Sequence, residues 1–187
     1  EYIKRFEDAF SRYCCVPFGV TTTSGTAALH LALAALGIKK GDEVIVPSFT
    51  MIATVFAVVY TGATPVLVDC EGDTGNVNTR NIEKKISKKT KAIIPVHIYG
   101  HPCDKDPIMA IAKWKKILVV EDAAEAHGAL YKNKKIGSIG DVGCFSFYAN
   151  KIITSGEGGM VVTKHKKIAE RLCLLKNLSF TKKRFIH

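Results

Sequence analysis

The chain has 187 residues, 47% of them hydrophobic and 24% charged, which is enough apolar material to bury a core. Lys and Arg number 27 against 17 Asp and Glu, a net charge of +10. No uncharged apolar run approaches the roughly 18 residues of a membrane-spanning helix, and the first ten residues are too charged for the core of a secretory signal. We expect a globular, cytoplasmic protein without a membrane partner.

Short apolar runs alternate with longer amphipathic segments along the whole chain. We predict strands at 19–22, 44–47, 64–69, 92–97, 117–122, 144–147 and 159–163. We predict helices at 26–36, 51–60, 79–86, 107–115 and 164–178. The apolar runs are continuous rather than alternating, which indicates strands covered on both faces. The pattern predicts an α/β protein with three α/β/α layers and a mostly parallel sheet.

The segment Thr23-Ser24-Gly25-Thr26 lies directly between a short strand and an Ala/Leu-rich helix. The first turn of a helix has free N–H groups and the positive end of the helix dipole. Gly25 allows an anion to approach the backbone, and Ser24 and Thr26 add hydroxyls. The segment predicts a phosphate site. A plain N-cap at Ser24 is the structural alternative.

A second candidate is Glu121-Asp122, at the end of the apolar strand ILVVED. Ligands of α/β sheets bind outside the carboxyl ends of the strands, so Asp122 is well placed to hold a cation. The alternative is an acid that caps the next helix. His97 and Tyr99 also follow a strand end, and we expect them to line a substrate pocket, with loop packing as the alternative.

The third candidate is Lys151, which follows the strand-like run CFSFYAN and precedes the glycine-rich turn SGEGG. A lysine in such an apolar and aromatic setting suits an amine whose pKa is lowered by desolvation, so that it forms a Schiff base. A solvated surface lysine is the alternative. A phosphate site, a carboxylate, a strand-end serine at Ser146 and a sheltered lysine together match the needs of pyridoxal 5'-phosphate.

The cysteines and histidines do not indicate a metal. The six cysteines form no CxxC pair, and three of them lie in or beside apolar runs, as buried thiols in a reducing compartment do. His97, His101 and Cys103 lack a fourth ligand at a usual spacing, so we predict no metal site.

Three segments carry a family resemblance: TTTSGTAALHLALAALGIKKGDEVIVPSFT, EDAAEAHGA and GDVGCFSFYANKIITSGEGGMV. With them the chain resembles the DegT/DnrJ/EryC1/StrS sugar aminotransferases, which are pyridoxal-phosphate enzymes of fold type I. The resemblance implies that residues 1–187 form the cofactor-binding large domain. Family members carry in addition a small C-terminal domain and an N-terminal segment, and the ending FIH resembles the point where they continue.

The resemblance implies a role for several residues. Lys151 would form the Schiff base and move the proton, and Asp122 would pair with the pyridine nitrogen. Ser146 would bind the cofactor phosphate together with the Ser24-Gly25-Thr26 turn. Glu125 stands where many members have a glutamine that contacts the ring hydroxyl. Met51 replaces the aromatic residue that stacks on the ring in many members, so a thioether contact or another residue would take that part.

The resemblance also implies substrates and an assembly. Within the family, EAHGA and NKIITSGEGGM are most similar to the GDP-perosamine synthases. By this resemblance, the chain would transfer an amino group from L-glutamate to a nucleotide-linked 4-keto-6-deoxy sugar, here GDP-4-keto-6-deoxy-mannose. It would do so in a homodimer with shared sites. An alternative is a truncated, non-catalytic fragment that only binds the cofactor or a homologue.

A basic nucleic-acid binder is a third possibility, resting on charge alone. Only five of the 27 basic residues are arginines, whereas a nucleic-acid face favours Arg and clustered aromatic residues. We therefore expect no nucleic-acid partner.

Overall fold

A computed structural model describes residues 1–179, and the FIH ending lies outside the described residues. The helices are α1 (Tyr2–Tyr13), α2 (Gly25–Ala35), α3 (Ile52–Tyr60), α4 (Thr79–Lys85), α5 (Lys105–Lys115) and α6 (Lys166–Lys176), with a short 3-10 helix η1 (Ile98–Gly100). The strands are β1 (Phe18–Thr22), β2 (Glu43–Pro47), β3 (Thr64–Val68), β4 (Thr90–Ile93), β5 (Leu118–Asp122), β6 (Leu130–Tyr131), β7 (Lys134–Lys135), β8 (Val142–Ser146) and β9 (Gly159–Thr163).

Seven strands form one twisted sheet in the order β1-β9-β8-β5-β4-β2-β3. The neighbours from β3 to β8 run parallel, and β9 is antiparallel to both β8 and β1. β6 and β7 form a separate two-stranded hairpin. The mostly parallel α/β arrangement expected from the sequence is confirmed.

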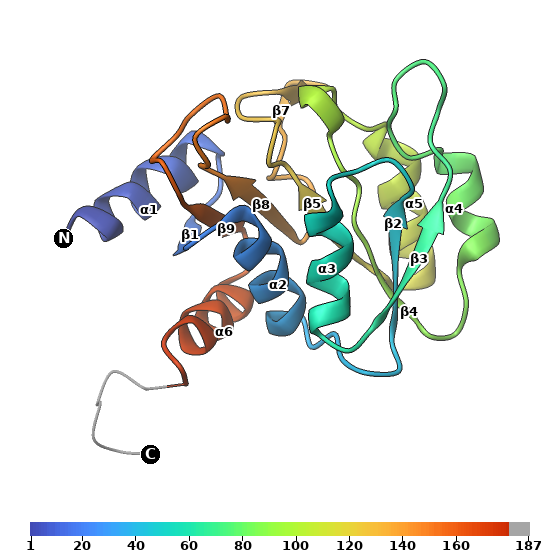
Figure 1. Ribbon diagram of the computed structural model, residues 1–187, viewed down its shortest axis with the longest axis horizontal. Helices are drawn as coiled ribbons and strands as arrows, with labels where there is room; N and C mark the ends of the chain where they lie inside the picture. The colour runs from blue at the N-terminus through green and yellow to red at the C-terminus, as the bar shows by residue number, and fades with distance from the viewer. Residues whose placement is uncertain (180–187) are drawn as a thin grey trace.

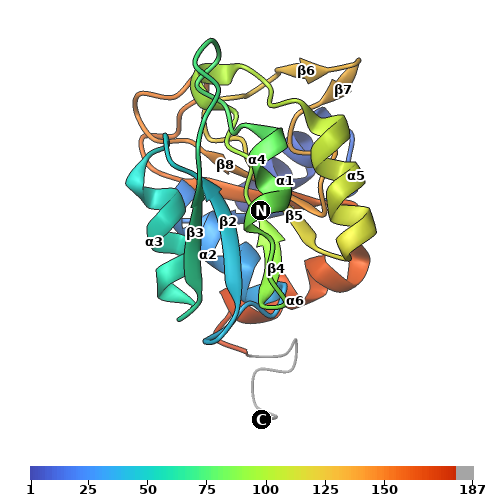
Figure 2. The ribbon, with the colours of Figure 1, turned by 90° about the vertical axis from the view of Figure 1, so that its right-hand side faces the viewer.

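Helices cover both faces of the sheet (Figure 1, Figure 2). α2, α3 and α6 lie on one face, and α1, α4 and α5 lie on the other. Side chains alternate along each strand, so Val44 and Val46 pack on the α2 face while Ile45 packs on the α5 face. The strands are therefore buried on both sides, which explains their continuous apolar sequence.

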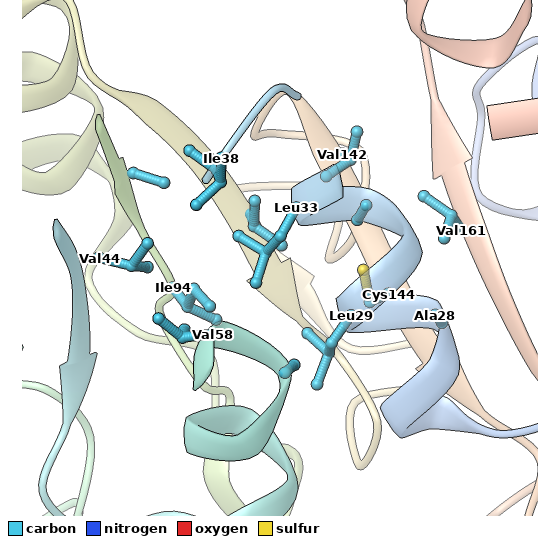
Figure 3. Packing of buried hydrophobic residues seen from close by; sticks show 14 of the residues in the cluster. Ala28, Leu29, Leu33, Ile38, Val44, Val58, Ile94, Val142, Cys144 and Val161 are labelled. Carbon is cyan, nitrogen blue, oxygen red and sulfur yellow. The ribbon is translucent and has the colours of Figure 1, made fainter. Parts of the chain in front are cut away.

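Among the described residues, the core on the α2 face forms one cluster, part of which Figure 3 shows, whereas the opposite face has two smaller ones. Figure 3 shows Leu29 and Leu33 of α2 with Val58 of α3 and Ile94 on one side and Cys144 of β8 on the other. Ser24 caps the N-terminus of α2, and Gly37 follows its C-cap, Leu36. The φ of Gly37 is +83°, a backbone conformation that glycine adopts without strain. The Ile38 amide then donates to the Leu33 carbonyl at 3.0 Å, which closes the helix end.

The structure differs from the sequence expectations in three places. Helix α1 and the β6-β7 hairpin were not expected, although Phe6 and Phe10 lie four residues apart and pack as a pair in α1. Strand β4 ends at Ile93 rather than at 97, because Pro95 has no N–H to donate to the ladder. Within residues 1–179, no helix has the length and apolar composition needed to cross a membrane.

We predict that Leu33→Ala lowers the free energy of unfolding by about 3 kcal/mol, because the side chain is fully buried and its loss leaves a cavity. Leu174→Ala is the control, since Leu174 is 39% exposed on α6, and it should cost less than about 1 kcal/mol. Urea denaturation of both variants measures the difference. Equal costs would contradict the assignment of Leu33 to the centre of the core.

Candidate active site

The carboxyl ends of β1, β2, β5 and β8 meet at one edge of the sheet, because these strands run in the same direction. The residues predicted to bind a ligand follow these ends. Ser24 comes after β1, Asp122 ends β5, and Ser146 ends β8. Lys151 lies in the loop that joins β8 to β9. Segments far apart in the sequence thus contribute to one candidate site.

The N-terminus of α2 and the end of β8 touch at this edge. A Cβ atom added to Gly25 would lie 2.7 Å from Cβ of Ser146, so only glycine permits this approach. Ser146 is 6% exposed. Ser24 caps the helix, its Oγ accepting from the Ala27 amide at 3.1 Å, so the capping role weighed as an alternative is present.

The first amides of a helix have no intrahelical partners, and the cap satisfies only that of Ala27. The amides of Gly25 and Thr26 belong to this first turn, where the helix dipole is positive. The hydroxyl of Ser146 lies beside them. This group of residues, here called the α2 cradle, has donors of the kind that an anion needs.

Asp122 lies on the α2 and α3 face of the sheet and is 5% exposed. Its Oδ2 accepts from the Thr54 hydroxyl at 2.8 Å, and its Oδ1 accepts from the Ala124 amide at 3.2 Å. Burial raises the pKa of Asp122 above its ordinary value, and the two hydrogen bonds oppose the rise only in part. The buried carboxylate is therefore short of positive partners.

Thr54 was missed in the sequence. Its hydroxyl lies 2.9 Å from that of Thr50, and because Thr54 donates to Asp122, Thr50 must donate to Thr54. The two threonines stand four residues apart, at the start of the otherwise apolar helix α3 that follows β2. The signal available in the sequence was this pair of threonines beside an otherwise apolar run.

Lys151 faces Glu125 across the site. Its Nζ lies 3.4 Å from Glu125 Oε1, and its side chain is 15% exposed, so the expected shelter is only partial. The other oxygen of Glu125 accepts from the Tyr99 amide at 2.7 Å. Burial raises the pKa of Asp122, and the positive charge of Lys151 offsets a small part of that rise, which places the amine within electrostatic reach of the carboxylate.

Tyr99 and Met51 lie at the surface near this site. The Tyr99 side chain is 80% exposed, with its ring 6.3 Å from that of Phe49. Its φ of +50° costs about 1 kcal/mol in a residue with a Cβ atom. Met51, at the N-cap of α3, is 64% exposed. The backbone strain at Tyr99 is of a kind that is common at functional sites.

His97 occupies a different environment from Tyr99. It is fully buried on the α5 face, with Nε2 3.3 Å from Glu121 Oε2 and Nδ1 accepting from the Cys103 amide at 3.1 Å. Burial lowers the pKa of His97, so the ring is neutral with its hydrogen on Nε2. Both ring nitrogens are thus engaged within the chain. The packing role weighed as the alternative for His97 is the one that the structure describes.

Glu121 is the neighbour of Asp122 and points to the opposite face. It accepts backbone N–H groups from Gly137, Ile139 and Gly140 at 2.7–3.2 Å. Lys105 Nζ, also fully buried, forms an ion pair with it at 3.3 Å. Burial opposes ionisation, but Lys105 and His97 outweigh it and hold the pKa of Glu121 well below its ordinary value. The sequence analysis assigned a role to Asp122 alone, and it missed that Glu121 holds three backbone amides and Lys105 together.

We predict that Thr54→Val raises the pKa of Asp122 further, because the lost hydroxyl bond stabilises the carboxylate. A carboxyl with a raised folded pKa loses stability as pH rises through that pKa. The variant should therefore be destabilised by about 2 kcal/mol at pH 7 and by less near pH 3.8, the ordinary pKa.

Denaturant unfolding of both proteins across this pH range measures the effect. Thr61→Val is the control, since Thr61, the C-cap residue at the other end of α3, bonds only to backbone groups, with its hydroxyl donating to the Val58 carbonyl. A cost of Thr54→Val that does not change with pH would contradict the assignment.

The chain resembles several known proteins along its full length. The model of the DegT/DnrJ/EryC1/StrS aminotransferase family matches residues 1–187. The chain is 53% identical over 173 residues to "GDP-perosamine synthase" of Escherichia coli O157:H7, covering 92% of this chain and 47% of that protein. It is 47% identical over 176 residues to "dTDP-3-amino-3,4,6-trideoxy-alpha-D-glucose transaminase" of Streptomyces venezuelae, covering 94% and 46%.

Solved structures agree with these relatives. DesV of S. venezuelae, in complex with a ketimine intermediate, superposes with a TM-score of 0.96 at 44% identity, covering 100% of this chain and 50% of that one. The PLP-form of the sugar aminotransferase Spr1654 of Streptococcus pneumoniae gives 0.87 at 36% identity, covering 94% and 50%. The chain spans about half the length of the curated relatives it matches. With the family model matching from end to end, the chain belongs to the DegT/DnrJ/EryC1/StrS aminotransferase family, whose cofactor is pyridoxal 5'-phosphate.

Proposed function

We propose that the chain is the cofactor-binding large domain of an aminotransferase that moves an amino group from L-glutamate to a nucleotide-linked keto sugar. The observation that carries the proposal is the meeting of a lysine, two carboxylates and the α2 N-terminus at one sheet edge. Family membership supports the same reading. Each residue role below is part of the proposal.

The residues at this edge fit pyridoxal phosphate. The α2 cradle has the amides of Gly25 and Thr26 in the first turn of α2 and the hydroxyl of Ser146, which come close together because position 25 has no Cβ. Asp122 is a buried carboxylate whose raised pKa reflects a shortage of positive partners. A protonated ring nitrogen would supply one. Lys151 offers the amine for the aldehyde.

When bound, pyridoxal phosphate supplies an aldehyde that accepts the amino group and a ring that withdraws electrons. Asp122 would hold a positive charge at the ring nitrogen, and Thr54 fixes the orientation of that carboxylate. Lys151 would hold and move the proton at its Nζ, as a general acid and base. Glu125 lies beside Nζ and would face the ring hydroxyl. Ser24 would support the cradle as the helix cap.

The sugar substrate is the finer part of the proposal. Two curated relatives at 53% identity are named GDP-perosamine synthase, which favours GDP-4-keto-6-deoxy-mannose as acceptor and GDP-perosamine as product. Other relatives at 47–50% identity are named for different nucleotide sugars. The net charge of +10 suits an anionic nucleotide sugar. Tyr99, exposed beside Glu125, is the proposed sugar contact, and Met51 a cofactor contact.

A homodimer is also part of the proposal. α3 exposes a row of large apolar side chains, each 43–59% exposed, namely Ile52, Phe56, Val59 and Tyr60. Large apolar patches of this kind are common at protein interfaces. A second copy of the chain is the partner that the family resemblance favours. A cytoplasmic location stays a prediction from the sequence.

A second candidate function is cofactor binding without transfer. In its favour, the cradle, Asp122 and Lys151 are each assigned to the cofactor, and no residue in the described part of the chain is assigned to the L-glutamate donor. Cofactor capture and amino transfer are therefore tested separately.

We predict that the purified chain mixed with pyridoxal phosphate develops the absorbance of a lysine-bound cofactor and that Lys151→Ala loses it. The reason is that Lys151 is the proposed site of covalent capture. Lys166→Ala is the control, because Lys166 is exposed on α6 and paired only with Glu170. Absorbance equal to that of the parent in Lys151→Ala would overturn the lysine assignment.

We further predict that L-glutamate converts the bound cofactor to its amino form, and that Asp122→Asn slows this conversion about a hundredfold or more by removing the charge at the ring nitrogen. Stopped-flow absorbance measures the rate, and 2-oxoglutarate is the product to quantify. Capture by Lys151 without any conversion would favour the second candidate, a chain that binds the cofactor without transfer.

A further inference from the structure

A short turn carries the backbone amide that binds Glu125. This turn, here called the 97–101 turn, runs from His97 to His101 and contains η1. It is closed by the Gly100 amide donating to the His97 carbonyl at 3.1 Å and the His101 amide donating to the Ile98 carbonyl at 3.0 Å. The left-handed backbone at Tyr99 and Gly100 leaves the Tyr99 N–H free of the turn, and it donates to Glu125 Oε2 at 2.7 Å.

One buried side chain joins the two ends of the turn. Asn76, 3% exposed in the segment between β3 and α4, accepts from the Ile98 amide at 3.3 Å through Oδ1. Its Nδ2 donates to the His101 carbonyl at 3.0 Å. The Asn76 backbone carbonyl accepts in turn from the Glu71 amide at 2.8 Å. The amide group of Asn76 thus satisfies one donor and one acceptor of the turn at once.

The start of the turn is fixed from the other side. The His97 amide donates to the Asp122 carbonyl at 3.1 Å, which joins the turn to the strand end that carries the carboxylate. The His97 ring is held between Glu121 and the Cys103 amide. The turn is also close to Glu125 at Gly100, where an added Cβ would lie 3.1 Å from the Glu125 carbonyl oxygen.

We propose that Asn76 and His97 are positioning residues for the active site. By fixing the 97–101 turn, they hold the Tyr99 N–H against Glu125 and so set the carboxylate oxygen that faces Lys151. Neither residue touches Lys151 or Glu125 through its own side chain in the described contacts. This inference rests on the proposed function, because it assigns the turn a part in cofactor binding at Lys151.

The first test needs no cofactor. Amide hydrogen exchange at Tyr99, followed by NMR in the cofactor-free chain, should become about tenfold faster in Asn76→Ala, because the turn no longer holds the amide against its acceptor. Asn78→Ala is the matched control. Asn78 lies two residues away and caps α4 by accepting from the Arg80 amide, without contact to the turn. Its loss should leave exchange at Tyr99 within twofold.

The second test is a double-mutant cycle with Glu125→Ala, read as the dissociation constant of pyridoxal phosphate. Asn76→Ala should weaken binding about tenfold in the parent chain and less than twofold in the Glu125→Ala chain, since the carboxylate it positions is then gone. A merely structural role would weaken binding equally in both backgrounds. Equal weakening, or unchanged exchange at Tyr99, would overturn the proposal.

Two further outcomes are separable. If the parent chain fails to bind pyridoxal phosphate, the proposed function fails and amide exchange alone decides the positioning role. If Asn76→Ala does not fold, Asn76→Asp and His97→Gln replace it. Asn76→Asp keeps the acceptor for the Ile98 amide, and His97→Gln keeps a donor for Glu121. Each should speed exchange at Tyr99 severalfold, and no change in either would contradict the proposal.

Discussion

One buried charge organises the end of the sheet where the site lies. Glu121 is ionised inside the core because three backbone amides, the His97 ring and the Lys105 ammonium surround it. A buried carboxylate without such partners is strongly unfavourable, and removing one partner of a buried pair typically costs about 3–5 kcal/mol. This single side chain therefore contacts the loop before β8, the N-terminus of α5 and the 97–101 turn.

The alternation of side chains along β5 turns that constraint into a site. Adjacent residues of a strand point to opposite faces, so Glu121 anchors the α5 face while Asp122 faces α3. The same rule directs Ser146 toward the start of α2 and Phe145 toward the core beneath α1. In each pair of neighbours, one residue stabilises the fold (Glu121, Phe145) and the next faces the candidate site (Asp122, Ser146).

Two features of the candidate site are unfavourable in the folded chain without a ligand. Asp122 is buried with two hydrogen bonds that do not fully compensate its desolvation, as the raised pKa indicates. Tyr99 keeps a backbone conformation that residues with a Cβ atom rarely adopt. Both features lower the stability of the chain, and a ligand with a cationic ring nitrogen would relieve the first. Such local costs are typical of functional sites rather than of scaffolding.

Sequence alone determined the strand and helix rhythm, the sheet type and the family, because apolar periodicity and glycine-bearing motifs are local properties. It also singled out Lys151, Asp122 and the Ser24 turn as residues at strand and helix ends. Only the tertiary structure decided that Thr54 bonds Asp122, that Glu125 reaches Lys151, and that His97 is buried with Glu121. These partners lie 24 to 68 residues apart, and no local pattern specifies which distant side chains the crossing helices and turns bring together.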